Sequence, residues 1–388
     1  MKLNYQYSDI IKSLILLAAF TLLSLMVSIN EFQVIYYNLG LEIIPVNLGT
    51  QDIISVSPYF DLFDLITVPL MLLIIIIVGF LYDHLGFWRL FLPIVIMLMI
   101  TIYFTESIAF MILLTPLNRP LFILTLAQII RFNKAVKPRI FFMTLTIACY
   151  VFIYPKTWEF FLSKELIDVL SSHTFELYFD LVTLFILTLS SIAVIYFIMF
   201  SRKQFKIKNL PVKFFIACLR IRQLTFSKQE MLFILLLSII VYLSRYAITH
   251  IMLKNTTNFD VNLSLVEGLE ITYMLIFCFW LRKSYSHKLR RKLRRLYVGI
   301  FCAILLLLLL SAFPLSVSLA EATYYLFYPL IVAVFLPILF YIFLNIIKLE
   351  QCKLLGFQLA LSFILISIIW RLSFFIAHYL IQITLLLI

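Results

Sequence analysis

The chain has 388 residues, and its composition excludes most soluble folds. Hydrophobic residues make up 64% of it and charged residues only 13%, whereas about a quarter of the residues in a soluble globular protein are charged. The formal net charge of +12 is explained by Lys and Arg on cytoplasmic loops, which membrane insertion favours. We therefore expect no nucleic-acid partner, and we predict an all-α, polytopic integral membrane protein within a lipid bilayer.

Apolar runs of about 20 residues, the length that crosses a bilayer, follow one another along the chain. The first half offers spans at 11–30, 61–82, 89–105, 107–130, 139–156 and 178–200. No small-residue cleavage site follows the first run, so it is interpreted as a signal anchor. The second half offers 230–253, 263–281, 297–314, 322–347 and 354–388. The last run is long for one span and short for two, so eleven or twelve transmembrane helices are predicted.

These spans predict two bundles of about six helices. Residues 1–200 form the N-terminal six-helix bundle, 201–228 a basic cytoplasmic central loop, and 229–388 a C-terminal bundle of five or six helices. Within the central loop, 212–222 has the pattern of an amphipathic helix that lies on the anionic inner leaflet, and a solvated linker is the alternative.

The distribution of charge supports this topology. If the N-terminus is cytoplasmic, the inside segments hold 25 of the 31 Lys and Arg residues, a sorting that one miscounted span would destroy. Those segments are 1–12, 82–90, 131–139, 201–228, 282–296 and 348–353. The predicted location is the inner (plasma) membrane of a cell, crossed many times, with the inner membrane of an organelle as the alternative. The basic run Arg282–Arg295 serves either as a topology anchor or as a site for anionic inner-leaflet lipids.

The connection between the second and third spans carries the main functional motif, GFLYDHLGFWRL. Gly79, near the end of its span, allows a neighbouring helix to approach closely, and Gly86 permits the tight turn of a short loop. Asp83 is one of the few acidic residues on the positive side of the membrane. Its carboxylate is best explained by a partner, either Arg89 or the N-terminus of a helix.

This segment resembles the cytoplasmic motif of the major facilitator superfamily, G-x-L-x-D-basic-x-G-basic-basic-x-L. The match covers Gly79, Leu81, Asp83, Gly86 and Leu90, with His84 and Arg89 as approximate basic equivalents, whereas Phe87 and Trp88 stand where basic residues are usual. The resemblance implies a transporter of two six-helix halves that rock against each other. It also implies that Gly79, Asp83, Gly86 and Arg89 form a gating latch that helps to hold the outward-facing state.

Ionisable residues at membrane depth are costly and usually face a cavity or a partner. The candidates for a substrate or ion pathway are Arg119, Arg245, His250, Glu267, Glu270, Arg371 and His378. The alternative for each is a structural ion pair, for example between Arg245 and Glu267 or Glu270. The two glutamates share one helix face and are expected in the first turn of their helix, where the dipole favours acids.

Two further patterns concern the same candidates. Arg371 and His378 lie seven residues apart, so they fall on one face of a helix, where they line either a water-filled path or a helix–helix contact. Pro120, beside Arg119, either kinks the fourth span or breaks it and exposes backbone groups to a cavity.

No metal site and no cofactor are predicted. The five cysteines have no spacing typical of metal ligands or of disulfides, and no aromatic stripe indicates a bound pigment.

The predicted function is secondary active transport of a small-molecule solute by alternating access. No ATP-binding loop is present, so a proton, ion or solute gradient supplies the energy, and the chain is expected not to be an enzyme. One alternative is a membrane glycosyltransferase or glycan polymerase that acts on a lipid-linked sugar, for which the carboxylates of the first outside segment would serve: Glu31, Glu42, Asp52, Asp61 and Asp64. A structural subunit of a membrane complex is the other alternative.

Overall fold

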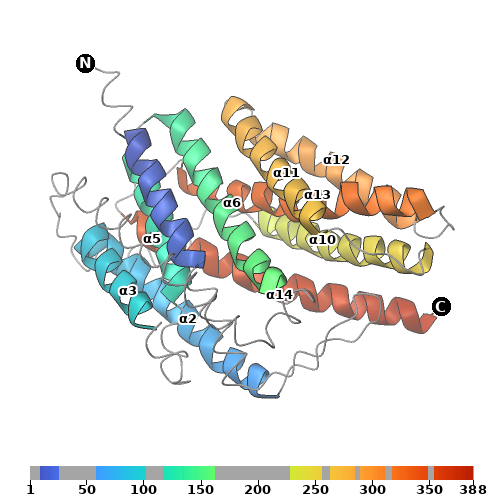
Figure 1. Cartoon of the computed structure of the whole chain (residues 1–388), viewed down its shortest axis with the longest axis horizontal. Helices are drawn as coiled ribbons and strands as arrows, with labels where there is room; N and C mark the ends of the chain where they lie inside the picture. The colour runs from blue at the N-terminus through green and yellow to red at the C-terminus, as the bar shows by residue number, and fades with distance from the viewer. Residues whose placement is uncertain are drawn as a thin grey trace, which may run out of the picture. The chain divides into compact units, whose positions relative to one another are not determined.

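A computed structural model of the whole chain provides the fold (Figure 1). It describes residues 9–25, 58–101, 117–133, 135–161, 228–255, 263–284, 289–310, 317–347 and 354–387. Within these ranges the regular structure is entirely helical, which confirms the all-α class. The predicted span 178–200, the central loop 201–228 with its amphipathic segment, and most of the first outside segment lie outside the described residues.

The chain divides into two compact units, and the last helix belongs to both. Unit 1 comprises Met1–Ala217 and Gln351–Leu361, and unit 2 comprises Cys218–Glu350 and Ser362–Ile388. The described part of this short segment, residues 354–361, is therefore packed with residues far before it in the sequence. This long-range packing places the start of the last helix in the candidate site.

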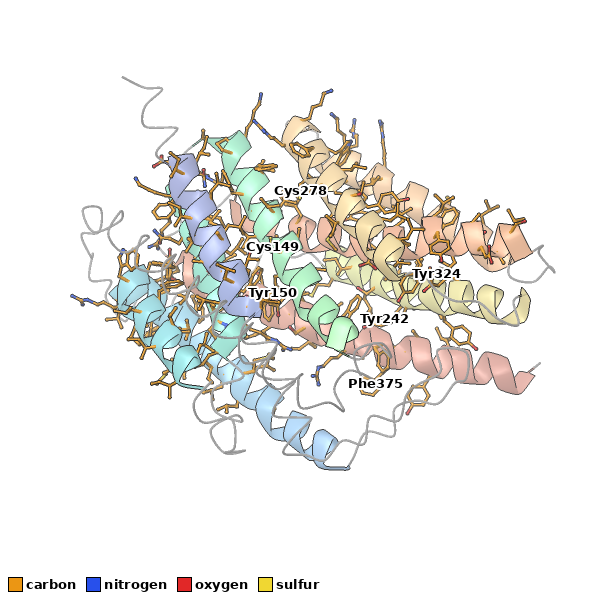
Figure 2. The ribbon with its side chains drawn as sticks, in the orientation of Figure 1. Cys149, Tyr150, Tyr242, Cys278, Tyr324 and Phe375 are labelled. Carbon is orange, nitrogen blue, oxygen red and sulfur yellow. The ribbon has the colours of Figure 1, made fainter. Side chains whose placement is uncertain are left out.

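Unit 1 is built around a helix that is buried on all sides. It contains a helix at 9–25, α2 (Pro58–Leu85), α3 (Phe87–Thr101), α5 (Asn118–Phe132), α6 (Val136–Phe161) and the start of α14 (Leu355–Leu387). α5 packs against α2, α3 and α6, and its residues from Leu121 to Ile130 are buried without interruption. The ring of Phe122 on α5 stacks on Tyr150 of α6, which is labelled in Figure 2, with centroids 4.3 Å apart. A helix that is buried on every side in this way is a core element.

Unit 2 is organised around α13. It contains α10 (Lys228–Asn255), α11 (Leu263–Ser284), α12 (Leu289–Leu310), α13 (Val317–Ile347) and the rest of α14. α13 packs against α10 and α11, and α10 also packs against α12. Tyr242 of α10, labelled in Figure 2, contacts Trp370 and Phe374 of α14 with centroid distances of 4.5 and 5.4 Å. Aromatic contacts thus fix α14 against α10 within this unit.

The helices coincide with the predicted spans wherever both are described, with two differences. α12 begins at Leu289, eight residues before the predicted span at 297, so Arg290–Arg295, the second part of the basic run, is helical throughout. The final apolar run forms one continuous helix of 33 residues, α14. It would extend for roughly 50 Å at 1.5 Å per residue.

By length and apolar composition, one helix among the described residues qualifies as a candidate membrane span, at Leu355–Ala377. Shorter apolar segments lie at Pro69–Leu85, Phe87–Leu98 and Met231–Ser244. Both units nevertheless carry large apolar side chains on their outer surfaces, for example Leu73 on α2 and Phe375 on α14, which are 54% and 58% exposed. Apolar surface of this kind requires a partner or lipid around it.

Candidate functional site

Gly86 makes the turn between α2 and α3. Its φ of 83° lies in the left-handed region, and its N–H donates to the carbonyl of Tyr82 at 3.0 Å, which closes the last turn of α2. α3 begins at the next residue, Phe87. This conformation is open to glycine at little cost, so the predicted role of Gly86 in a tight turn is confirmed.

Gly79 brings α2 against the start of α14. A Cβ atom at Gly79 would lie 2.6 Å from the Cβ of Ala360 and 2.7 Å from the carbonyl oxygen of Gly356. A Cβ atom at Gly356 would in turn lie 2.6 Å from the ring of Tyr82 and 2.7 Å from the carbonyl oxygen of Gly79. Neither position has room for a side chain. The predicted close approach at Gly79 is confirmed, and α14 is the helix that approaches.

Asp83 caps the N-terminus of α14. Its Oδ1 accepts the backbone N–H of Gly356 at 3.1 Å, and its Oδ2 accepts that of Phe357 at 2.9 Å. The first N–H groups of a helix have no partner within the helix, and a carboxylate both satisfies them and complements the helix dipole. Helix caps usually come from the residue just before the helix, whereas Asp83 lies 273 residues before Gly356. The cap therefore joins distant parts of the chain.

Arg131, at the end of α5, completes the arrangement. Its Nη2 lies 3.1 Å from Oδ1 of Asp83, and its guanidinium carbon lies 4.5 Å from the centre of the Tyr82 ring. The Tyr82 hydroxyl donates to Oε1 of Gln128 at 3.1 Å. We name these four side chains, together with the amides of Gly356 and Phe357, the capping cluster. It links α2, α5 and α14.

The end of α5 is itself held in place by buried polar contacts. The Asn133 side chain donates to the hydroxyl of Ser13 at 2.8 Å and to the carbonyl of Ile129 at 2.9 Å. Nε of Arg139, on α6, donates to the backbone carbonyl of Asn133 at 2.6 Å. These bonds fix the last turn of α5 to the helix at 9–25 and to α6, and so they position Arg131 beside Asp83.

Burial controls the acidity of Asp83, which follows the predicted span 61–82. Its side chain has no solvent exposure. Burial raises the pKa of the carboxyl from 3.8 to about 6, although the amides of Phe357 and Gly356 and the charge of Arg131 act in the opposite direction. Desolvation of the charged form outweighs these three attractive contacts. The capping cluster thus contains a carboxyl group whose pKa is raised above its ordinary value by burial.

The other residues of the motif have different surroundings. Arg89 is exposed on α3, and Arg131 takes the place at Asp83 that the sequence suggested for Arg89. Phe87 is buried and stacks on Phe91 with centroids 4.6 Å apart. Because this position packs into unit 1, an aromatic residue fits where the resembled motif has a basic one.

Arg119 is not part of the capping cluster. It lies in the first turn of α5, and its guanidinium contacts the sulfur of Met71 on α2. Pro120 lies in the same first turn, a position where proline is well tolerated. Arg131 lies 12 residues further along, so the two arginines are separated by roughly 18 Å along α5. The predicted topology already separates the two arginines, because Asp83 and Arg131 lie in the inside segments 82–90 and 131–139, whereas Arg119 lies within the predicted span 107–130.

The remaining pathway candidates are on helices of unit 2. Arg245 and His250 lie on α10, Glu267 on α11 and His378 on α14, and their side chains are outside the described part of the structure. Glu270 is fully buried on α11. α11 begins at Leu263, so the first turn contains no acid and the expected placement of the two glutamates there is wrong. Arg371 is exposed on α14.

Sequence reasoning missed three contributors to the site: Tyr82, Gln128 and Arg131. A weak signal existed for Arg131, because a cation is favoured in the last turn of a helix and the inside segments 82–90 and 131–139 place it on the same side as Asp83. Gly356 is one of only seven glycines and stands at the start of an apolar run. Among the residues that the structure describes, no group of three His, Cys, Asp or Glu side chains is arranged to hold a metal ion.

Comparison of the chain with protein family models and with curated proteins finds no match.

Proposed function

We propose that the chain is a polytopic membrane protein with two helical bundles that transports a small solute by alternating access, as the resemblance to the major facilitator superfamily implies. The observation that carries the proposal is the cap that Asp83, paired with Arg131, places on α14. In the resembled family a latch at this loop helps to hold the outward-facing state. The exposed apolar faces of both units and the sorted charges of the loops support a membrane setting.

The favourable and unfavourable free-energy contributions in the capping cluster are similar in size, as expected for a contact that opens and closes. A helix cap contributes about 0.5–2 kcal/mol, and the ion pair to Arg131, whose side chain is 38% exposed, adds about 0–1 kcal/mol. Against this, Nε2 of Gln128 is buried and has no hydrogen-bond partner among the residues that the structure describes, which costs about 1–3 kcal/mol. These contributions nearly cancel. A balance of a few kcal/mol is one that solute binding or protonation can shift.

The proposal predicts that the first turn of α14 becomes accessible from water during the cycle. Phe357 is only 4% exposed, so a Phe357→Cys variant without native cysteines reacts with a charged maleimide only when the cluster opens. We expect slow, complete labelling in membrane vesicles and faster labelling when Asp83→Asn is added. The exposed position Lys137, tested as Lys137→Cys, gives the reference rate. A Phe357→Cys variant that reacts only after denaturation would exclude opening and favour a static subunit.

Lowering the pH is expected to favour the closed form of the capping cluster. Asp83 binds a proton with a pKa of about 6 when buried, against an ordinary value of 3.8, so protons stabilise the closed form as the pH falls through 6, and the gain levels off below 3.8. Between pH 7.5 and pH 5 the labelling of Phe357→Cys, divided by that of Lys137→Cys, should fall by about tenfold. A ratio independent of pH, or one that rises in acid, would show that Asp83 is not the titrating group.

A further inference from the structure

The outward surface of α12 changes character at one point along the helix. The exposed residues Arg291, Arg295, Val298, Cys302 and Leu306 follow one another at intervals of three or four, so they form a single stripe. The stripe is basic up to Arg295 and apolar from Val298, which is 57% exposed. A water-exposed helix has no reason to continue a basic stripe with large apolar side chains.

The exposed surface of α11 shows the same change from basic to apolar, but in the reverse order along the sequence. Its exposed stripe runs through Ile271, Leu275 and Phe279 to Arg282, and changes from apolar to basic in the last turn. Residues 285–288 connect the two helices and span at most about 18 Å. The basic end of α11 and the basic end of α12 therefore lie at the same end of this helical pair, where side chains with nitrogen tips extend outward in Figure 2.

The inward faces fix this orientation. On α12, Leu293 and Tyr297 are buried, and the Tyr297 ring contacts Phe233 of α10 with centroids 5.6 Å apart. On α11, Cys278 and Leu281 are fully buried. The exposed cations cannot turn inward without removing these side chains from the core of unit 2.

The basic end carries a large excess of positive charge. The run Arg282–Arg295 contains eight Lys and Arg residues, and the sequence has no Asp or Glu between Glu270 and Glu321. The cations on α12 also occupy its first turns, where the helix dipole is positive and anions are favoured. An anionic surface at this end would relieve the repulsion between these charges.

We propose that this end of the helical pair is a binding rim for the headgroups of anionic phospholipids, and that the apolar stripes of α11 and α12 face acyl chains. The rim comprises Arg282, Lys283, Arg291, Lys292 and Arg295, all exposed. A soluble anion or a nucleic acid would use the cations but would leave the adjoining apolar stripes in water. A phospholipid would contact both, because its charged headgroup would lie beside the cations while its acyl chains lie along the apolar stripes. The inference does not depend on transport.

The rim can be tested on the full chain in neutral detergent. Palmitoyl-oleoyl phosphatidylglycerol or the matching phosphatidylcholine is added, and the midpoint of thermal unfolding is measured. We expect only the anionic lipid to raise the midpoint. In Arg291→Gln/Arg295→Gln, at least about tenfold more of it should be required, because each basic residue near an anionic surface contributes roughly 1 kcal/mol. Arg291→Lys/Arg295→Lys should respond like the wild type, and so should Lys137→Gln, an exposed cation of unit 1.

Three results would contradict the proposed lipid-binding rim: equal stabilisation by both lipids, an unchanged response of the glutamine variant, or equal stabilisation by inorganic phosphate or by a short oligonucleotide.

A second measurement tests the apolar stripe of α12 through its native thiol, Cys302. With Cys302 as the single cysteine, a charged maleimide should not label the protein in phosphatidylglycerol vesicles, whereas Arg291→Cys should be labelled. Labelling of Cys302 at the rate of Arg291→Cys would place the stripe in water and contradict the proposal.

Discussion

Gly79→Ala is expected to lower the midpoint of thermal unfolding by several degrees. The added methyl would lie 2.6 Å from the Cβ of Ala360 and 2.7 Å from the carbonyl oxygen of Gly356. Neither atom belongs to a flexible side chain that can move aside, so the two helices must separate. Overpacking of this kind costs about 1–3 kcal/mol. Gly356→Ala should have a similar effect, because its methyl would meet Tyr82 and the carbonyl oxygen of Gly79.

Matched controls come from glycines in open surroundings. A Cβ atom at Gly268 or Gly299 would have no neighbour within 4 Å in the described part of the chain, so alanine there should be neutral or stabilise by about 0.5–1 kcal/mol through helix propensity. Gly79→Ala/Ala360→Gly should recover part of the loss, since it removes the nearest clashing atom. Equal midpoints for Gly79→Ala and Gly299→Ala would show that α2 and α14 do not pack as described.

The properties of the motif that depend on backbone geometry were predictable from sequence. Gly86 between two apolar runs indicates a turn because few other residues adopt its conformation. Gly79 near a helix end indicates a close contact because it removes a side chain. The need of Asp83 for a helix N-terminus or a cation was also predictable, since an isolated carboxylate is rarely left without a partner in a buried position.

The residues that contact Asp83 were not predictable in the same way. Arg131 rather than Arg89 meets Asp83, although Arg89 is much nearer in sequence. The choice is set by the packing of α5 against α2 and by the Asn133 contacts that hold the end of α5. Such contacts depend on the assembled unit. Likewise, no local pattern indicates that the helix capped by Asp83 begins 272 residues later, at Leu355.

Hydropathy located the apolar part of each helix better than its ends. The prediction began the ninth span at 297 because Arg290–Arg295 is basic, yet Arg and Lys are good helix formers and α12 begins at Leu289. The start of α11 at Leu263 matches the predicted span 263–281, so Glu270, seven residues further along, lies beyond the first turn, which contains no acid. The continuity of α14 was left open because its length fits neither one ordinary span nor two.

Asp83→Asn is expected to reduce solute flux by roughly tenfold or more while expression is maintained. Asparagine does not mimic the protonated acid here, because its Nδ2 group donates and opposes one of the two α14 amides, whereas both oxygens of the acid accept. Leaving a buried donor without an acceptor costs about 1–3 kcal/mol, and the attraction to Arg131 is lost as well. The measurement is uptake into proteoliposomes of each labelled amino acid, sugar or carboxylic acid that the wild-type protein carries.

A comparison of flux among several variants distinguishes loss of the capping cluster from general misfolding. Arg131→Gln should lower flux in the same direction but less than Asp83→Asn, because Arg131 is partly exposed and its ion pair is screened. Combined with Asp83→Asn it should add little, since the two residues act through one contact. Arg89→Gln, exposed on α3, should leave flux near the wild-type level. Wild-type flux in Asp83→Asn, or a larger loss in Arg89→Gln than in Arg131→Gln, would contradict the role of the cluster as a latch.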